Sequence, residues 1–472
     1  MSTRDEAVAQ ATAYAETHRD QALSELCDFL TIPSISADPA HGTDVRHAAE
    51  WMAKWITSEG GDAEIIGTAG HPLVWGEFAA GPRPERADRP TVLIYGHYDV
   101  QPVDPLELWE TDPFNPVSRE GRLYARGASD MKAQIMAACA AIRAVKRTGS
   151  LPVNVKFLLE GEEEIGSPSL PDALSANKER FSADVCLNPD AGMFGPKEPT
   201  ICYGLRGMAY FELHIRGPER DLHSGHFGGV VHNPAQAIAE IVAGLHTPDG
   251  RVTLPGFYDR VREITPEERG RLARMPLTKE QLTGQSGVPE LWGDEAFSVA
   301  ERIGARPSLD VHGIGTGYAG PGPKTVIPAE AMAKMSARLV PDQRPEDVRE
   351  QLLTYLRDSV PPTITYELIE LGAGGAYLCD PTSPAHTAMA GALTDVWGVA
   401  PVLSRSGGSV PVANELRELL GMDSVLTGFA LPDDQIHSPN ESQHLDNWYR
   451  GIEALVRFFY RYGGAELQLT AS

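Results

Sequence analysis

The sequence predicts an α/β domain, a mixed sheet with helices on both faces, that is interrupted by an inserted α+β domain. The 472 residues exceed the roughly 250–300 that one hydrophobic core organises, so two domains are expected. Up to Asp190, short apolar runs alternate with helical patterns, as they do in α/β sheets. From about Gly207 onwards, strands of alternating apolar and polar residues predict a sheet with one exposed face.

The first part of the chain is predicted to alternate helices with buried strands. An amphipathic pattern predicts a helix from about Glu6 to Phe29, which Pro33 ends. A second helix is expected over residues 43–58, and a third, rich in alanine, begins near Asp130. Short apolar runs bounded by turn residues predict strands that are buried on both faces. These strands are TVLIYG at 91–96, VNVKFLLEG at 153–161 and ADVCLNPD at 183–190.

The inserted part is predicted to form an open-faced sandwich from strands and helices in the order β-α-β-α-β. A long irregular segment, rich in proline and charge, is expected at 248–308. The predicted elements are the strand MAYFELHIRG at 208–217, a helix from Asn233 to Leu245, the strand AMAKMSARLV at 331–340, a helix over 345–360 and the strand TITYELIEL at 363–371. Helices at Pro384–Trp397 and Asn447–Tyr462 then return to the α/β pattern. The expected boundaries are 1–206, 207–374 and 375–472.

Composition narrows the class of protein. The formal net charge of -24 disfavours a nucleic acid or an anionic membrane as partner. The polar first twenty residues lack the apolar core of a signal peptide, and no apolar stretch reaches transmembrane length. The five cysteines are scattered and without CxxC spacing, which is typical of a reducing compartment. We therefore expect a cytoplasmic protein.

Five side chains have the chemistry of a metal site. His97 and Asp190 follow predicted strands directly, and Glu164 lies in an acidic run, EGEEE, that follows a third. Asp130 and His437 come from a helix start and a late loop. Each has an ordinary alternative, because His97 can be a hydrogen-bonded residue at a strand end and Asp130 a helix N-cap. Together, three carboxylates and two imidazoles suit a mixed nitrogen and oxygen site for Zn²⁺ or Mn²⁺.

The order of several motifs resembles the M20 metallopeptidase family, especially its cytosolic non-specific dipeptidase and carnosinase branch. The resemblance covers about residues 20–460. It is carried by GHYDVQP, YARGASDMK, EGEEEIGS, DLHSG, KTVIP, SGGSVP and IHSPNES. It implies a di-metal peptidase domain that is interrupted by a lid and dimerisation domain, residues 207–374.

The resemblance also implies roles for residues of the metal site. Asp130 would bridge two divalent cations, and the peptide bond after it would be cis. His97 and Asp190 would complete one metal site, and Glu164 and His437 the other. Glu163 would be the general base that activates water, and Asp99 would orient His97.

Further roles are implied for the substrate site. His223 would stabilise the oxyanion of the reaction bound at the partner subunit of a homodimer. Arg338 would bind the substrate's carboxylate. Thr325 and the backbone of Gly407, Gly408 and Ser409 would line the same pocket. Ser406 departs from the family pattern, which has an acidic residue before the Gly-Gly-Ser, and no role is assigned to His386.

The expected activity is hydrolysis of dipeptides or short peptides that carry a free carboxylate. Because Ser406 replaces an acidic residue, an N-acyl-amino-acid amidohydrolase of the same family is the alternative. A homologue that binds peptides without cleaving them is a further alternative, which the complete set of expected ligands disfavours.

Overall fold

The computed structural model describes residues 3–81, 89–408 and 410–469. The chain forms two compact units. The first comprises Met1–Tyr203, Cys379–Leu403 and Glu415–Ser472, and the second Gly204–Leu378 and Ser404–Asn414. The second unit therefore includes residues 404–414. The sequence pattern assigns these residues to the second part of the α/β domain, 375–472.

A nine-stranded mixed sheet forms the framework of the first unit. Its order is β1-β2-β6-β3-β7-β17-β8-β15, with β16 also paired to β8. At its centre β3 (Thr91–His97) runs parallel to β6 (Asn154–Glu160) and β7 (Val185–Asn188). The strand β2 (Leu73–Phe78) is antiparallel to β6, so the sheet is mixed, as predicted.

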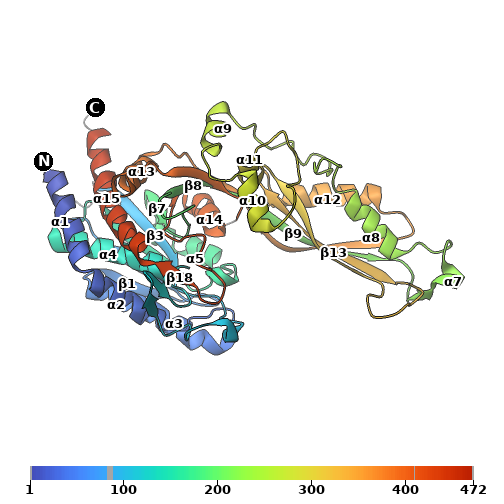
Figure 1. Ribbon diagram of the computed structural model, residues 1–472, viewed down its shortest axis with the longest axis horizontal. Helices are drawn as coiled ribbons and strands as arrows, with labels where there is room; N and C mark the ends of the chain where they lie inside the picture. Colours follow the sequence, from blue (N-terminus) through green and yellow to red (C-terminus); the bar gives the residue numbers. More distant parts are fainter. Residues whose placement is uncertain (1–2, 82–88, 409, 470–472) are drawn as a thin grey trace. The chain divides into compact units, whose positions relative to one another are not determined.

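Helices cover this sheet because its central strands are apolar on both faces. Residues 92–97 of β3 are all buried. The alanine-rich helix α4 (Lys132–Thr148) contacts β3 and is buried along most of its length. Two further helices, α1 (Thr3–Thr17) and α15 (Leu445–Leu469), pack on α4 and on each other, so the first and the last helix lie side by side (Figure 1). Burial of these apolar faces supplies the main driving force for folding the unit.

The predicted N-terminal helix is two helices. The first, α1, ends at Thr17, and α2 (Arg19–Leu30) follows after His18, whose φ of -114° is not helical. The hydroxyl of Thr17 donates to the carbonyls of Ala13 and Tyr14, and the His18 ring bonds to the Tyr14 carbonyl. Such side-chain bonds compete with the helical ladder. The amphipathic pattern alone does not reveal this break.

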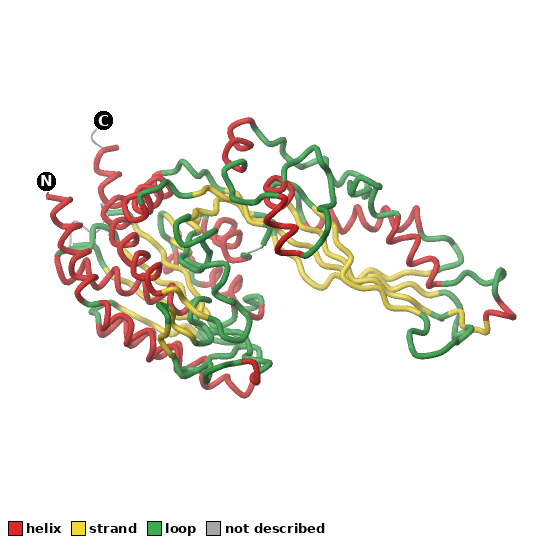
Figure 2. Tube along the Cα trace, in the orientation of Figure 1, coloured by secondary structure: helices red, strands yellow, loops and turns green. Residues whose placement is uncertain are grey.

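The second unit contains a four-stranded antiparallel sheet of order β11-β13-β9-β14. Its strands are β9 (Gly207–Arg216), β11 (Ser308–Thr316), β13 (Glu330–Leu339) and β14 (Thr365–Gly374). Residues of β9 alternate between buried and partly exposed, as predicted. The helices α8 (Pro234–Ala243) and α12 (Pro345–Ser359) pack on the sheet (Figure 2).

The segment 248–308, predicted to be irregular, contains three short helices. They are α9 (Pro266–Leu272), α10 (Lys279–Ser286) and α11 (Val299–Gly304). Capping boxes begin two of them, with Thr278 and Gln281 at α10 and Ser298 and Glu301 at α11. The helices are too short to show a clear apolar periodicity, but the S/T-x-x-E/Q pattern was readable.

The remaining α-helices and β-strands complete the sheets and the layers around them. They are α3 (Gly42–Ser58), β1 (Asp62–Ile66), β4 (Val117–Arg119), β5 (Arg122–Tyr124), α5 (Leu170–Ala176), α6 (Lys178–Phe181), β8 (Thr200–Leu205), β10 (Leu222–His223), α7 (Ser224–Phe227), β12 (Val326–Ile327), β15 (Tyr377–Leu378), α13 (Pro384–Trp397), β16 (Val402–Ser406), α14 (Pro411–Leu420), β17 (Ser424–Leu426) and β18 (Ser442–His444).

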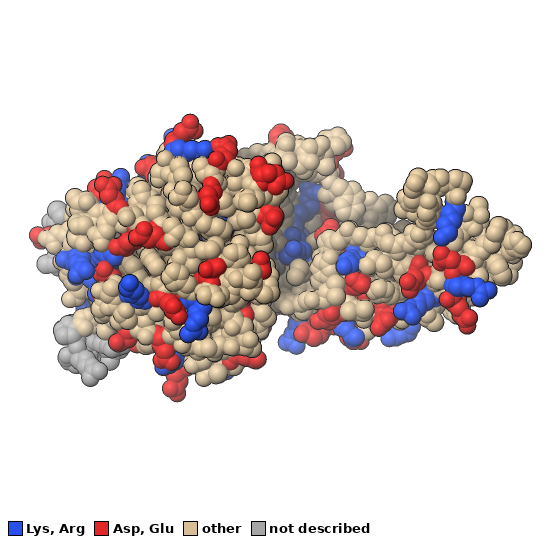
Figure 3. All heavy atoms as spheres, turned by 90° about the horizontal axis from the view of Figure 1, so that it is seen from below, with Lys and Arg blue, Asp and Glu red and all other residues tan. Residues whose placement is uncertain are grey.

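Charged side chains are spread over the surface. On the face drawn in Figure 3, lysine and arginine are interspersed with aspartate and glutamate. None of the helices in the described ranges has both the length and the apolar character that crossing a bilayer requires.

Candidate metal centre

Polar side chains gather where the central parallel strands end. His97 is the last residue of β3, and Asp190 lies two residues beyond the end of β7. Glu163 and Glu164 begin a single 3₁₀ turn three residues after β6. The carboxyl ends of neighbouring parallel strands lie at one edge of a sheet, where open α/β sheets form their sites.

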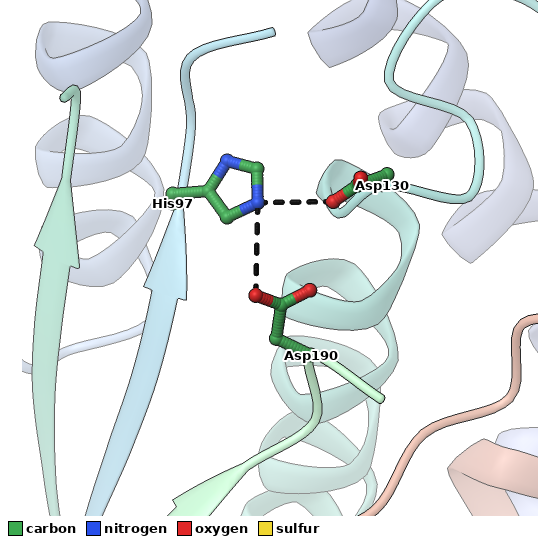
Figure 4. Close-up of side chains that lie close together, drawn as sticks. All are labelled: His97, Asp130 and Asp190. Atoms are coloured by element: carbon green, nitrogen blue, oxygen red, sulfur yellow. Dashed lines mark hydrogen bonds and ion pairs between the residues drawn. The ribbon is translucent and has the colours of Figure 1, made fainter. Parts of the chain in front are cut away.

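His97, Asp130 and Asp190 form a first group of candidate ligands (Figure 4). The Nε2 atom of His97 lies 3.0 Å from Oδ1 of Asp130 and 3.9 Å from Oδ2 of Asp190. One nitrogen and two oxygens therefore converge on one point, although the three residues come from segments far apart in the chain.

Asp130, Glu164 and His437 form a second group around the other oxygen of the same aspartate. The Nε2 atom of His437 lies 3.0 Å from Oδ2 of Asp130 and 3.3 Å from Oε2 of Glu164. Gln101 donates from Nε2 to Oε2 of Glu164 at 2.8 Å, which fixes this carboxylate. Asp130 thus presents one oxygen to each group, as a carboxylate that two cations could share would do.

Asp99 lies beneath the His97 ring and is completely buried. The Nδ1 atom of His97 is 3.1 Å from the Asp99 carbonyl oxygen and 3.5 Å from its Oδ1. The other carboxylate oxygen accepts from the Glu164 N–H at 3.1 Å. Because Nδ1 faces these acceptors, it carries the proton and leaves Nε2 available as a ligand. The nearer acceptor is the backbone carbonyl, so Asp99 contacts the His97 ring through both its main chain and its side chain.

The loop that carries Asp130 is held by Glu441. One carboxylate oxygen accepts from the N–H groups of Ser129 and Asp130 at 2.9 and 3.0 Å. The other accepts from the Gly127 N–H at 3.0 Å and from Arg126 Nη1 at 2.7 Å. Glu441 is 1% exposed, so these bonds are shielded from water. The Asp130–Met131 peptide is cis, as the family resemblance implied.

Sequence reasoning assigned no role to Glu441 or to Asp434. Asp434 is buried and accepts from the hydroxyl of Ser129 at 2.9 Å and from Arg122 Nη1 at 2.7 Å. Both acids lie within four residues of His437, inside or beside the IHSPNES motif. Their proximity to His437 could have indicated a role in the site, but acidic residues in loops are usually solvated and are not predicted to be functional for that reason alone.

The site concentrates negative charge. Burial raises the pKa of Asp190 well above its usual range, and the charge of Asp130 raises it further. Hydrogen bonds to Asp130 and Glu164 raise the pKa of His437 to about 10. For Asp130 itself, burial acts to raise the pKa, but the bonds with His437 and His97 lower it below its usual range. Such a cluster of carboxylates is stabilised by cations.

Two further carboxyl groups close to the cluster have raised pKa values. Burial raises the pKa of Glu163, against the opposing effect of His97. Burial also raises the pKa of Glu160 to about 8, although the Tyr95 hydroxyl donates to its Oε1 at 2.7 Å. Glu163 therefore combines a position beside the candidate ligands with a raised proton affinity.

The candidate substrate residues all lie in the second unit. His223 pairs with Val326 across β10 and β12, and the Ser224 N–H donates to the Thr325 carbonyl at 3.0 Å, so His223 and Thr325 are neighbours. Arg338 lies opposite Met208 in the sheet, near the start of β9. The pairing of Glu330 with Arg216 lies eight residues further along. At about 3.4 Å per residue, Glu330 and Arg338 are about 27 Å apart along β13. His223 belongs to the Glu330 end, because its partner Val326 precedes Glu330 in the chain and α7, which follows His223, lies at the tip of this unit (Figure 1).

The remaining predicted positions surround β16 and α13. Gly407 and Gly408 follow β16, whereas Ser409 lies outside the described residues. The Ser406 hydroxyl accepts from the Gly408 N–H at 3.1 Å. His386 is buried, with Nε2 3.2 Å from Cys379 Sγ and Nδ1 2.8 Å from Ser383 Oγ. These contacts make His386 a hydrogen-bonded residue of the core.

Comparison with known proteins assigns the family. The chain is 33% identical to the Cys-Gly metallodipeptidase of Schizosaccharomyces pombe over 94% of this chain and 95% of that protein. It is 30% identical to the human β-Ala-His dipeptidase over 94% of this chain and 91% of that protein. A solved structure of an M20 family metallo-carboxypeptidase from Sulfolobus solfataricus is 35% identical, covers 94% of this chain and 99% of its own, and superposes with a TM-score of 0.82. Residues 93–461 match the model of peptidase family M20/M25/M40, and the chain belongs to this family.

Proposed function

We propose that this protein is a metal-dependent hydrolase that cleaves the peptide bond of dipeptides. The observation that carries the proposal is the pair of ligand groups that share the two oxygens of Asp130. The family relatives include Cys-Gly and β-Ala-His dipeptidases, which support this substrate class.

The donor set fits two divalent cations. His97, Asp130 and Asp190 would hold one, and Asp130, Glu164 and His437 the other. Imidazole nitrogens and carboxylate oxygens are ligands for Zn²⁺ and Mn²⁺ alike. When bound, such cations lower the pKa of water and polarise the scissile carbonyl.

Glu163 is the proposed general base. Its raised pKa lets the carboxylate take a proton from the attacking water and pass it to the leaving amine. Glu164, its neighbour in the same turn, is fixed by Gln101 and Asp99 and is thereby committed as a ligand. Two adjacent glutamates thus have different roles because their contacts differ.

Arg338 is proposed to bind the carboxylate of the substrate, and His223 is proposed to bind the oxyanion. The planar guanidinium of Arg338 matches the free carboxylate of a dipeptide. The Gly225 N–H donates to Nδ1 of His223 at 3.0 Å, so the proton of the neutral ring is on Nε2. Nε2–H can then donate to the oxyanion that forms at the scissile carbonyl.

The spacing of these two residues supports a homodimer. A dipeptide is about 7 Å long, since an extended residue spans about 3.3–3.6 Å. Arg338 lies about 27 Å along β13 from Glu330, at whose end of the sheet His223 lies, so His223 and Arg338 of one subunit cannot both contact one dipeptide. We infer that His223 serves the substrate bound by the partner subunit, and that the second unit is the lid and dimerisation domain of the α/β catalytic domain.

One observation favours a second candidate, an N-acyl-amino-acid amidohydrolase. At Ser406 a hydroxyl, already bonded to the Gly408 N–H, takes the place of an acid that would attract a free amino group. A substrate with a blocked amino group loses nothing by this replacement. It would use the same proposed ligands and Arg338.

A product screen tests the proposal. The metal-loaded protein should cleave free dipeptides faster than matched N-acyl amino acids, and a chelator should abolish both activities. Faster cleavage of the acylated set would overturn the substrate class. Absence of both activities, with no metal bound at saturating Zn²⁺ or Mn²⁺, would support a non-catalytic peptide-binding protein.

The five cysteines support the proposal of a reducing, cytoplasmic compartment. All five are free thiols, and four of them are buried. Thiols that persist without forming disulfides are typical of the cytosol.

A further inference from the structure

We infer that Arg206 is a positioning residue that holds the substrate-carboxylate site together and selects free carboxylates. The inference rests on the proposed function, because it concerns the site of Arg338. Arg206 lies between β8 and β9, and its side chain is only partly exposed. Neither its sequence context nor the family resemblance singled it out.

Arg206 binds the backbone of the loop that follows β16. Its main-chain N–H donates to the Gly408 carbonyl at 3.2 Å, and its Nε donates to the Gly407 carbonyl at 3.1 Å. The loop lies so close that a Cβ at Gly407 would be 3.0 Å from Nη2 of Arg206 and 3.2 Å from the Ile303 carbonyl. A side chain at position 407 would push the loop away, so the glycine and the arginine act together.

The same guanidinium reaches the strand that pairs with Arg338. Nη1 of Arg206 lies 3.4 Å from the hydroxyl of Ser308 and 3.5 Å from the Arg306 carbonyl. Ser308 is the residue directly opposite Arg338 in the β11–β13 pairing. Arg206 therefore connects the loop of Gly407 and Gly408 with the Arg338 end of the sheet, and all of these residues belong to the second unit.

The two guanidinium groups also interact through their charges. Burial and, after it, the charge of Arg338 lower the pKa of Arg206 to about 10, with Asp310 opposing. With a pKa of about 10, Arg206 remains charged at neutral pH. Two neighbouring cations raise the potential for an anion, so Arg206 should strengthen binding of a carboxylate and not of a neutral amide.

Arginine suits this role better than lysine. Its flat group offers five N–H donors in a fixed arrangement, which lets it bond the Gly407 carbonyl and Ser308 at once. Lysine at this position would keep the charge but lose the fixed arrangement of N–H donors. The geometric and the electrostatic parts of the role are thus separable by substitution.

The test compares a dipeptide with its C-terminal amide. Binding of both is measured by calorimetry in metal-loaded protein carrying Glu163→Gln, so that turnover does not interfere. Adding Arg206→Gln should lower the preference for the free acid by about tenfold, because a charged partner is lost. Arg206→Lys should recover part of it. In the active protein, Arg206→Gln should raise KM for the dipeptide with kcat changed less than about threefold.

The control is Arg216→Gln, at the other end of β9, where the side chain is 67% exposed beside Glu330. It should leave the preference unchanged. Equal weakening of acid and amide by Arg206→Gln would show a structural role only and overturn the inference, as would an unchanged preference. If the glutamine variant does not fold, Arg206→Lys still tests the geometric part of the role, and an unchanged preference in that variant would overturn the inference. Failure of the proposed function is distinct, because it would appear as absence of dipeptide cleavage by the unsubstituted protein.

Discussion

Replacing Glu441 with glutamine removes one charge from the support of the candidate metal centre and keeps the shape of the side chain. Each oxygen of Glu441 accepts two bonds, one oxygen from Ser129 and Asp130 and the other from Gly127 and Arg126. A glutamine keeps one acceptor oxygen and presents an NH₂ group at the other position. Two donors then face a donor in a place that water does not reach, since Glu441 is 1% exposed.

The structure sets the size of the effect. A hydrogen bond to a charged group contributes about 1.5–3 kcal/mol, so loss of two costs about 3–6 kcal/mol of unfolding free energy. The Asp130 N–H is among the four donors, so the carboxylate proposed to bridge the cations also loses part of its support. Changing a group that orients a metal ligand typically lowers metal affinity about 10–100-fold.

Urea unfolding and calorimetric titration with Mn²⁺ measure these two quantities. The control is Glu453→Gln on α15, where the side chain is 37% exposed and pairs with Arg457. It should change the unfolding free energy by less than about 0.5 kcal/mol and leave the metal affinity unchanged. If Glu441→Gln behaves like this control in both measurements, Glu441 does not support the site and the reasoning is refuted.

Other substitutions test the base, the exchange between subunits, a buried carboxyl group and a close backbone contact. Glu163→Gln should lower kcat by about 10²–10⁴-fold with metal content, measured by mass spectrometry, unchanged; a normal kcat would remove Glu163 as the base. Subunits carrying Glu163→Gln, mixed with subunits carrying His223→Ala, should recover about a quarter of normal activity, because half of the dimers assemble one complete site. No recovery after confirmed exchange would place His223 in its own subunit's site. For Glu160, the folded state holds the proton up to about pH 8 against an ordinary pKa of 4.5, so its stabilising contribution is full below pH 4.5 and is lost as the pH rises through about 8. Glu160→Gln should flatten this fall in the urea unfolding of chelator-treated protein, and an unchanged slope would contradict the shift. Gly428→Ala places a Cβ 1.7 Å from the Ala191 carbonyl, so it should lower both the melting temperature and the metal content; normal values of both would mean that the backbone moves without cost.

Local pattern was sufficient for the central strands and the residues that follow them. The apolar runs before His97, Glu163 and Asp190 predict buried strands, and such strands place their ends at a common edge. Composition and periodicity likewise predicted α4, α12 and α13 within a few residues. These features depend on neighbours in the sequence, so the sequence contains the information directly.

Short or interrupted elements were missed because they do not show a pattern among neighbouring residues. The break at His18 depends on side-chain bonds to the Tyr14 carbonyl, and the helices between residues 266 and 304 are shorter than the window that periodicity needs. The strand β11 was also missed, because most of its residues are exposed and it contains no apolar run.

By itself, the sequence determined the kind of chemistry, the family and the strand ends that carry His97, Glu163 and Asp190. Only the tertiary structure decided that His97 and His437 approach opposite oxygens of Asp130, and that Glu441 holds the loop between them. It alone placed His223 and Arg338 toward opposite ends of the sheet, and Arg206 between the Gly407 carbonyl and Ser308. The physical reason is that these relations depend on strand register and on contacts between segments hundreds of residues apart, which leave no local pattern in the chain.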